Sequence, residues 1–210
     1  MSKTVLILGA SRGIGLGLAR EFLERGWKVV ASERDRGDDL HALEGEKLRI
    51  VTADVTKPES YADLGLSDSS VDVIIVNAGI TGAKHQDACQ ATSDEVAHVM
   101  MTNAFGPARA ARELLPRIKD GGSLSFMSSL MGSIEDSSGG YDLYRTSKTA
   151  QNMLAKGIAE QHAKERDIAV LSLHPGWVQT DMGGENAKLT VHESVSGLAD
   201  VVENSGGAGY

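Results

Sequence analysis

The stretch KTVLILGASRGIGLG, residues 3–17, runs from an apolar segment straight into a glycine-rich one. Residues 5–8 are all apolar, which is typical of a strand that is buried on both faces. Gly9, Gly13 and Gly15 then mark a turn into a segment with helical spacing. Missing side chains at such a turn let backbone N–H groups and the positive helix end approach a pyrophosphate. The stretch therefore predicts a dinucleotide-binding turn, although a tight turn without a ligand would need the same glycines.

Short apolar runs and helical segments alternate along the rest of the chain. Residues spaced four apart, such as Ile14, Leu18 and Phe22, indicate helices between the runs. This alternation predicts right-handed βαβ units, and so an α/β fold with one doubly wound parallel sheet covered by helices on both faces. No linker or repeat interrupts the 210 residues, and we expect one NAD(P)-binding domain over 1–210. The predicted strands are residues 3–8, 27–32, 47–53, 71–76, 122–128 and 168–174.

Local signals mark where several of the helices begin and end. Thr92 and Glu95 have the spacing of a capping box, which predicts a helix over about 93–116. Asp120-Gly121-Gly122 predicts a turn between that helix and the next strand. Two further helices are expected over 143–162 and 191–205.

Composition argues against several classes of function. The net charge of −8 and the lack of any lysine or arginine run predict no binding to nucleic acid or to an anionic membrane. The apolar run at 5–10 is too short for a signal peptide or a membrane span. Cys89 is the single cysteine, so the chain has no internal disulfide, and a reducing cytoplasm is the expected location. The six histidines form no H-x-x-x-H pair, and we expect no metal site.

Six short motifs occur in a fixed order at the ends of the predicted strands. They are GASRGIG (9–15), DVT (54–56), NAG (77–79), SS (128–129), YRTSK (144–148) and HPGWVQT (174–180). Together they resemble the short-chain dehydrogenase/reductase family, over roughly residues 3–182. The stretches 128–148 and 176–195 more narrowly resemble the C-factor and sniffer-type carbonyl reductase branch of that family.

The resemblance implies a catalytic set. Tyr144 matches the tyrosine of the family's Y-x-x-x-K motif, which acts as general acid or base, and Lys148 is its lysine. Ser129 matches the serine that hydrogen-bonds the substrate carbonyl, and Asn103 matches the asparagine that anchors a water chain to the lysine. Tyr141 is excluded, because the residue four positions later is an arginine. A phenol titrates near pH 10, and a neighbouring ammonium favours the phenolate and lowers that pKa.

The end of the second predicted strand bears on the choice of cofactor. Glu33 stands at the position where an acidic residue binds the adenosine ribose and repels a 2′-phosphate. Arg34 follows at once, and Arg12 lies inside the glycine turn, where either arginine could hold the phosphate. Two arginines against one glutamate favour NADP(H) over NAD(H). The positions expected at the cofactor are Gly9, Ser11, Arg12, Gly13, Ile14, Gly15, Glu33, Arg34, Asp54, Val55, Asn77, Ala78, Gly79, Tyr144, Lys148, Pro175, Gly176, Val178 and Thr180.

Two functions remain open from the sequence. The first is an NAD(P)-dependent oxidoreductase acting on a small ketone, aldehyde or secondary alcohol. The second is a dinucleotide-binding signalling or regulatory protein of the C-factor type without significant turnover. Residues 206–210 contain three glycines and predict that the family's seventh strand is short or missing. One dimer contact of the common tetramer is built around that strand, so we expect a monomer or a helix-packed homodimer.

Overall fold

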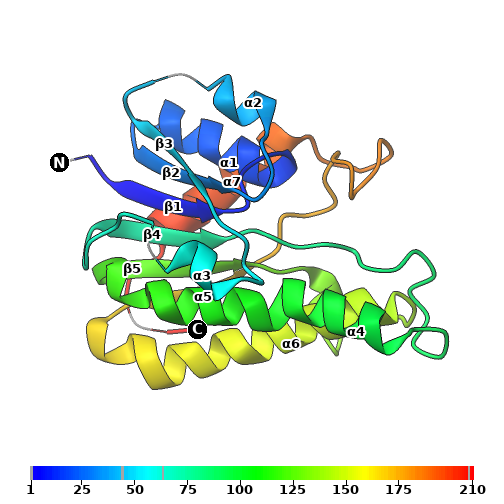
Figure 1. The fold of residues 1–210 in the computed structure, drawn as a ribbon. Coiled ribbons are helices and arrows are strands. Elements are labelled where there is room, and N and C mark those ends of the chain that lie inside the picture. Colours follow the sequence, from blue (N-terminus) through cyan, green and yellow to red (C-terminus); the bar gives the residue numbers. More distant parts are fainter. Residues whose placement is uncertain (1, 44, 63, 208) are drawn as a thin grey trace.

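Six parallel strands form one sheet in the order β3-β2-β1-β4-β5-β6 (Figure 1). The computed structural model describes residues 2–43, 45–62, 64–207 and 209–210. This sheet, with its helices on both faces, confirms the predicted doubly wound α/β fold. The strands are β1 (Thr4–Leu8), β2 (Lys28–Glu33), β3 (Leu48–Thr52), β4 (Val71–Val76), β5 (Ile118–Met127) and β6 (Ala169–Leu173).

Two apolar cores lie on opposite faces of the sheet. In β1, Leu6 and Leu8 join the core under α5 and α6, whereas Val5 and Ile7 join the core under α1 and α7. All four side chains are fully buried, which explains the unbroken apolar run in the sequence. The helices that cover the two faces appear below and above the sheet in Figure 1. They are α1 (Gly13–Glu24), α2 (Asp38–His41), α3 (Pro58–Tyr61), α4 (Ser93–Met100), α5 (Gly106–Leu114), α6 (Asp142–Ile158) and α7 (Val191–Asn204).

The capping box predicted at Thr92 opens α4. The Thr92 hydroxyl accepts the Glu95 N–H at 3.2 Å, and the Glu95 carboxylate accepts the Thr92 N–H at 2.9 Å. A second capping box opens α7, where Thr190 and Glu193 exchange the same two bonds. Reciprocal bonds of this kind satisfy N–H groups that a helix start leaves without partners, so both starts are fixed locally.

The predicted helix over 93–116 is one helical stretch with an irregular centre. A π-helical segment, Met101–Phe105, joins α4 to α5, and a 3₁₀ turn, Leu115–Arg117, ends the stretch. The π segment has no marker in the sequence. It widens the helix by one residue per turn around Asn103, and such segments are frequent at functional sites. The expected helix over 143–162 likewise continues past α6 through a π segment, Ala159–Ala163.

The turn expected at residues 120–122 is wrong in detail, because these residues lie inside β5. Ile118 already pairs with Val71 of β4, and pairing resumes at Ser123 opposite Val73. The extra residues bulge out between the two pairs, with Gly121 at a φ of 75°. A Cβ at Gly122 would come within 2.5 Å of the Asp72 carbonyl oxygen, so a glycine is needed there.

Among the residues that the structure describes, a single bridge stands in the place of a seventh strand. Gly209 pairs in parallel with Ala169 of β6, and its carbonyl accepts the Val170 N–H at 2.9 Å. The Tyr210 hydroxyl lies 2.9 Å from the Ser172 hydroxyl and holds the same segment against β6. Ala208 lies outside the described residues. The expectation of a short or missing seventh strand agrees with this arrangement.

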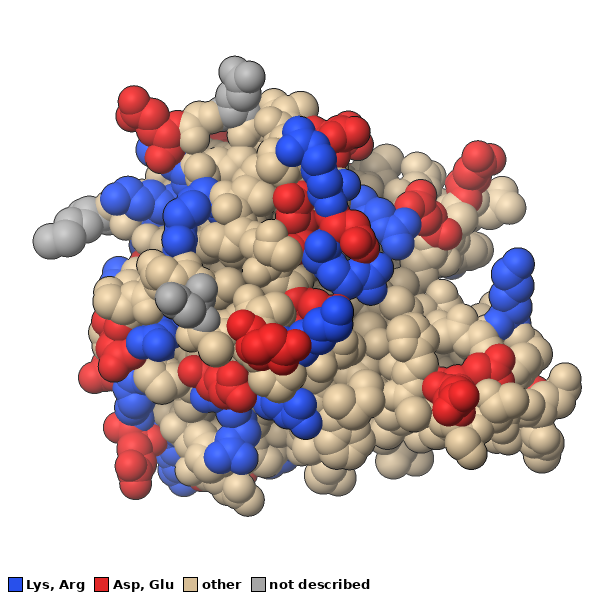
Figure 2. Space-filling model, viewed as in Figure 1, with Lys and Arg blue, Asp and Glu red and all other residues tan. Residues whose placement is uncertain are grey.

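The carboxyl ends of the strands all reach the same edge of the sheet, on the right of Figure 1. The loops that leave this edge carry the predicted site motifs. In the view of Figure 2, lysine and arginine side chains are interleaved with aspartate and glutamate side chains, mainly over the left and middle of the molecule. Within the described residues, no helix is both long enough and apolar enough to cross a bilayer.

Candidate active site

Tyr144 and Lys148 lie one turn apart near the start of α6. The Lys148 Nζ atom is 5.8 Å from the centre of the Tyr144 ring. The expectation that the pKa of Tyr144 is lowered is wrong, because burial raises the pKa of the phenol and a hydrogen bond with the Ser129 side chain only opposes that rise. Tyr141, by contrast, is 56% exposed and stands at the N-cap of the helix. The structure therefore places Tyr144, and not Tyr141, beside the lysine and the serine.

Lys148 is the most deeply buried charged side chain of the site, at 3% exposure. Its Nζ atom donates to the Met127 carbonyl oxygen at 2.7 Å and to Gln151 Oε1 at 3.2 Å. Burial lowers the pKa of Lys148 to about 8. The ammonium is thus held by neutral acceptors and has no carboxylate partner in these bonds, which leaves its positive charge free to act on a neighbouring oxygen.

Ser129 follows the end of β5 and caps a short 3₁₀ turn, Leu130–Gly132. Its hydroxyl accepts the Met131 N–H at 3.1 Å. With that bond made, the hydroxyl hydrogen is still available to a second acceptor. The neighbouring Ser128 instead donates to Asn152 Oδ1 at 2.6 Å, which separates the roles of the two adjacent serines.

Asn103 is completely buried and joins three parts of the site. Its Oδ1 accepts the Ile80 N–H at 2.8 Å, and its Nδ2 donates to the Ile80 carbonyl oxygen at 2.7 Å. The same Nδ2 donates to the Ser147 hydroxyl at 3.0 Å, and Ser147 in turn donates to the Tyr144 carbonyl oxygen at 2.8 Å. Asn103 thereby connects the π segment, the loop after β4 and the helix that carries Tyr144.

Gly79 borders the space between the asparagine and the lysine. A Cβ at this position would lie 3.4 Å from Asn103 Oδ1 and 3.5 Å from Lys148 Nζ. The end of the NAG motif therefore meets the predicted catalytic residues directly, although the sequence separates them by 24 and 69 positions. Glycine leaves that space open.

The glycine turn is built for close backbone contact. A Cβ on Gly15 would come within 2.0 Å of the Gly9 carbonyl oxygen, and Gly9 itself has a φ of 87° and packs on Ala78. Asn77 Nδ2 donates to the Gly9 carbonyl oxygen at 2.7 Å. Asn77 and Ala78 of the NAG motif thus hold the shape of the turn, a role that the sequence did not assign to them. The open cradle suits the pyrophosphate of a dinucleotide.

Both oxygens of the Glu33 carboxylate have partners within the protein, so the carboxylate is not free to bind a ribose. One carboxylate oxygen accepts the Gly37 N–H at 2.8 Å, and the other lies 2.8 Å from His41 Nε2. Burial raises the pKa of Glu33, but these hydrogen bonds outweigh it and the pKa is lowered. Glu33 therefore shapes the loop after β2.

Arg34 stands at the rim of a polar hollow of about 530 Å³, beyond the ends of β2 and β3. Its side chain is 64% exposed and pairs with Asp35 at 2.8 Å. Asp54 contributes to the same hollow, and its carboxylate accepts the Thr56 N–H at 2.9 Å. Val55 is buried beneath it. Lys57 adds a second cation, so two cations and the two carboxylates of Asp35 and Asp54 line this hollow.

The segment after β6 closes over the glycine turn. Arg12 pairs with Asp181, and both side chains are largely exposed. A Cβ on Gly13 would lie 3.5 Å from Thr180 Cγ2, so the two segments touch. Val178 is buried and pairs with Leu189 in an isolated bridge. The remaining predicted positions flank these contacts and are Ser11, Ile14, Pro175 and Gly176.

Several residues of the site were missed from the sequence. Gln151 accepts a hydrogen bond from Lys148, and Ser147 accepts one from Asn103. Ser147 lies inside the Y-x-x-x-K motif and Gln151 three residues after it, so their positions on the helix could have indicated them. Gln86 contacts Tyr144 from a loop and has no local signal. The described residues contain no group of three or more metal-ligating side chains.

The comparison with known proteins agrees with this geometry. The short chain dehydrogenase family matches residues 3–189, and the chain belongs to this family. A carbonyl reductase from Pseudomonas aeruginosa PAO1, solved with NADP, is 41% identical, with a TM-score of 0.90 over 100% of this chain and 93% of that one. A short-chain dehydrogenase/reductase from Burkholderia multivorans with bound NADP is 39% identical, with a TM-score of 0.93 over 99% and 93%.

Two further relatives confirm the narrower resemblance. The C-signal protein of Myxococcus xanthus is 38% identical over 138 residues, which cover 63% of this chain and 81% of that protein. The carbonyl reductase Sniffer of D. melanogaster is 29% identical, with a TM-score of 0.88 over 98% of this chain and 93% of that one. The chain is thus an oxidoreductase-family protein of the C-factor and sniffer type.

Proposed function

We propose that the protein is an NADP(H)-dependent oxidoreductase that interconverts a ketone or aldehyde and a secondary or primary alcohol. The observation that carries this proposal is the buried ammonium of Lys148 beside the phenol of Tyr144. A buried lysine without a carboxylate partner costs folding free energy. A protein that only binds a dinucleotide has no need for that cost.

Tyr144 is the proton donor in the reducing direction. Its raised pKa keeps the phenol protonated near neutral pH, which is the form that gives a proton to a carbonyl oxygen. Ser129, which hydrogen-bonds the Tyr144 side chain, can turn its hydroxyl hydrogen to the same oxygen and hold it near the phenol. Lys148, with a pKa of about 8, is charged at neutral pH and stabilises the phenolate that remains. Bound NADP(H) supplies or accepts the hydride.

The preference for NADP(H) is supported by three observations. Glu33 is occupied by Gly37 and His41, so it does not present a free carboxylate against a 2′-phosphate. Arg34 is exposed at the polar hollow, and Arg12 is exposed at the glycine turn. The relatives from Pseudomonas aeruginosa and Burkholderia multivorans were solved with NADP.

A panel of aliphatic and aromatic ketones and aldehydes, assayed with NADPH and with NADH, tests the proposal. Cofactor oxidation followed by absorbance should show turnover that is faster with NADPH. If NADPH binds but no compound of the panel is turned over, the alternative of a signalling or regulatory protein is favoured. One relative carries the name C-signal. Faster turnover with NADH would show that Arg34 and Arg12 do not select the cofactor.

A further inference from the structure

Gln86 lies in the loop between β4 and α4 and is a buried polar residue outside the predicted catalytic set. Its side chain is 7% exposed, and its backbone has a φ of 59°, a left-handed conformation that is uncommon for residues other than glycine. Such a conformation persists where the surrounding contacts over-determine it. The contacts of its carboxamide show what holds it there.

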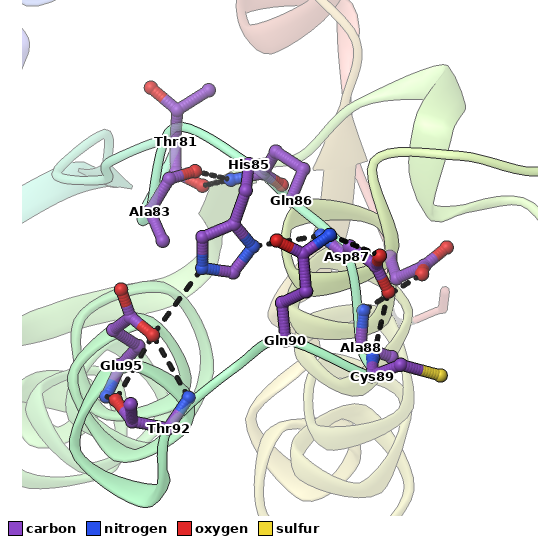
Figure 3. A network of polar contacts seen from close by, with 11 residues as sticks. Thr81, Ala83, His85, Gln86, Asp87, Ala88, Cys89, Gln90, Thr92 and Glu95 are labelled. Atoms are coloured by element: carbon purple, nitrogen blue, oxygen red, sulfur yellow. Dashed lines mark hydrogen bonds and ion pairs between the residues drawn. The ribbon is translucent and has the colours of Figure 1, made fainter.

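The Gln86 carboxamide is hydrogen-bonded to three backbone groups of the protein. Nε2 donates to the carbonyl oxygens of Thr81, at 2.8 Å, and Ala83, at 2.5 Å. Oε1 accepts the backbone N–H of Tyr144 at 3.0 Å. Figure 3 shows the Gln86 side chain turned back toward the carbonyl groups of Thr81 and Ala83. Both sides of one amide group are used, so its orientation is fixed.

The start of α6 needs an outside partner. Its N-cap residue, Tyr141, has a left-handed backbone and provides no side-chain cap. The Tyr144 N–H, in the first turn, would therefore lack the acceptor that an N-cap side chain normally supplies. Gln86 supplies that acceptor from 58 positions upstream. Asp142 makes a second link, because its carboxylate accepts the Ala88 N–H at 3.0 Å.

The same loop is anchored at other points of the site. Ile80 is bound on both backbone groups by Asn103, and His85 lies 3.4 Å from the Glu95 carboxylate that caps α4 (Figure 3). Motion of residues 80–86 relative to Asn103 is thus restricted. Gln86 extends that anchored segment to the backbone of Tyr144.

We propose that Gln86 is the positioning residue for Tyr144, setting the place of the phenol relative to Lys148 and Ser129 by fixing the first turn of α6. This inference rests on the proposed function, since it assigns to Tyr144 the proton transfer. It goes beyond that function in naming a loop residue on which the geometry of the transfer depends. A displacement of about 1 Å in a reacting group can lower the rate about 10²-fold, so the effect is measurable.

The contact itself is tested on the unaltered protein by residue-resolved hydrogen exchange. The Tyr144 amide should be protected to a degree similar to the Arg145 amide, which donates to the Tyr141 carbonyl oxygen at 2.8 Å. Exchange of the Tyr144 amide at the rate of an unstructured chain would overturn the proposal. This measurement requires no turnover, so its failure is distinct from a failure of the proposed function.

The consequence for catalysis is tested with Gln86→Met, which keeps the length of the side chain and removes its hydrogen bonds. The kcat should fall by up to about 10²-fold while the dissociation constant of NADPH stays unchanged. Gln90→Met is the matched control, because Gln90 is an exposed residue of the same loop whose side chain donates to the Asp87 carboxylate at 2.6 Å. An unchanged kcat in a folded Gln86→Met protein would overturn the proposal.

A spectrophotometric titration separates positioning from general stability. The Tyr144 phenol is identified as the absorbance change that Tyr144→Phe removes. In Gln86→Met its pKa should move down toward the ordinary value of about 10, because a loosened helix start admits water to the buried ring. A lower melting temperature with an unaltered Tyr144 pKa and kcat would show that Gln86 only stabilises the loop.

Discussion

Lys148 Nζ lies 5.8 Å from the centre of the Tyr144 ring and donates a hydrogen bond to the carbonyl oxygen of Met127, the last residue of β5. The lysine is therefore tied to the sheet, while the tyrosine is tied through its backbone to Gln86 and Ser147. The relative position of the ammonium and the phenol is therefore set by the end of β5 and by the loop that carries Gln86.

The burial of Lys148 makes stability depend on pH. Its pKa is about 8 in the folded protein against 10.5 in an exposed lysine, so the unfolded chain binds the proton more tightly. The folded protein loses stability as the pH falls from 10.5 to 8, and the full cost is on the order of 3 kcal/mol below that range.

Lys148→Met removes this proton linkage. The variant should gain stability relative to the wild type as the pH falls from 10.5 to 8, in urea unfolding measured at several pH values. Lys156→Met is the control, because Lys156 lies on the same helix and pairs with Glu160 in a half-exposed ion pair. A difference between wild type and Lys148→Met that does not change with pH would contradict the burial argument.

Arg34→Ala tests the choice of cofactor. Loss of a charge-assisted hydrogen bond to a 2′-phosphate should weaken NADPH binding by roughly 1.5–3 kcal/mol and leave NADH binding nearly unaltered. Isothermal titration with each cofactor measures both effects. Arg117→Ala removes the same charge from an ion pair with Asp68 and should alter neither affinity. Equal losses for both cofactors in Arg34→Ala would mean that Arg34 contacts the adenosine and not the phosphate.

Asn103→Leu should destabilise the protein by about 1–3 kcal/mol, because the partly buried N–H and carbonyl groups of Ile80 would lose their partner. Asn204→Leu is a matched control, since Asn204 makes one bond, to the Asp200 carbonyl oxygen, in an exposed setting. Denaturant unfolding of both variants gives the comparison. Equal stability of the two variants would show that the Asn103 network contributes little to folding.

The fold could be predicted from the sequence because its decisive signals are local. Apolar runs of five or six residues identify strands buried on both faces, and Thr92 with Glu95 fixes a helix start within one turn. The order of the motifs at strand ends then brings Gly9, Asn77 and Ser129 to one edge of the sheet.

What could not be predicted depends on distant partners. The early start of β5 is set by Val71 of the neighbouring strand, and no local pattern marks Ile118 as its first residue. Glu33 stands at a position where a ribose ligand was expected, and its actual partners come from a loop that folds back on it. Gln86 was missed because its partner is 58 residues away.

The assembly prediction is open to a direct test. A single bridge at Gly209 covers the edge of β6 in the part of the chain that the structure describes. Val96, Phe105 and Met153 leave apolar surface exposed on the helical stretches 93–116 and 142–163, which would form the helix-packed dimer. We expect a monomer or a helix-packed homodimer in light scattering coupled to size exclusion. If a dimer forms, Phe105→Glu or Met153→Glu should dissociate it. A stable tetramer would contradict the prediction. The cytoplasmic location and the single domain over residues 1–210 are also still predictions.

The central claim is that the Tyr144 phenol transfers the proton, and its most direct test is the single-turnover oxidation of NADPH by Tyr144→Phe on a carbonyl substrate that the wild-type protein reduces. Removing a general acid should slow this step by at least about 10²–10⁴-fold while NADPH still binds with its original affinity. Tyr141→Phe, on the exposed neighbour, should keep the wild-type rate. A near-normal rate in folded, NADPH-binding Tyr144→Phe protein would contradict the account.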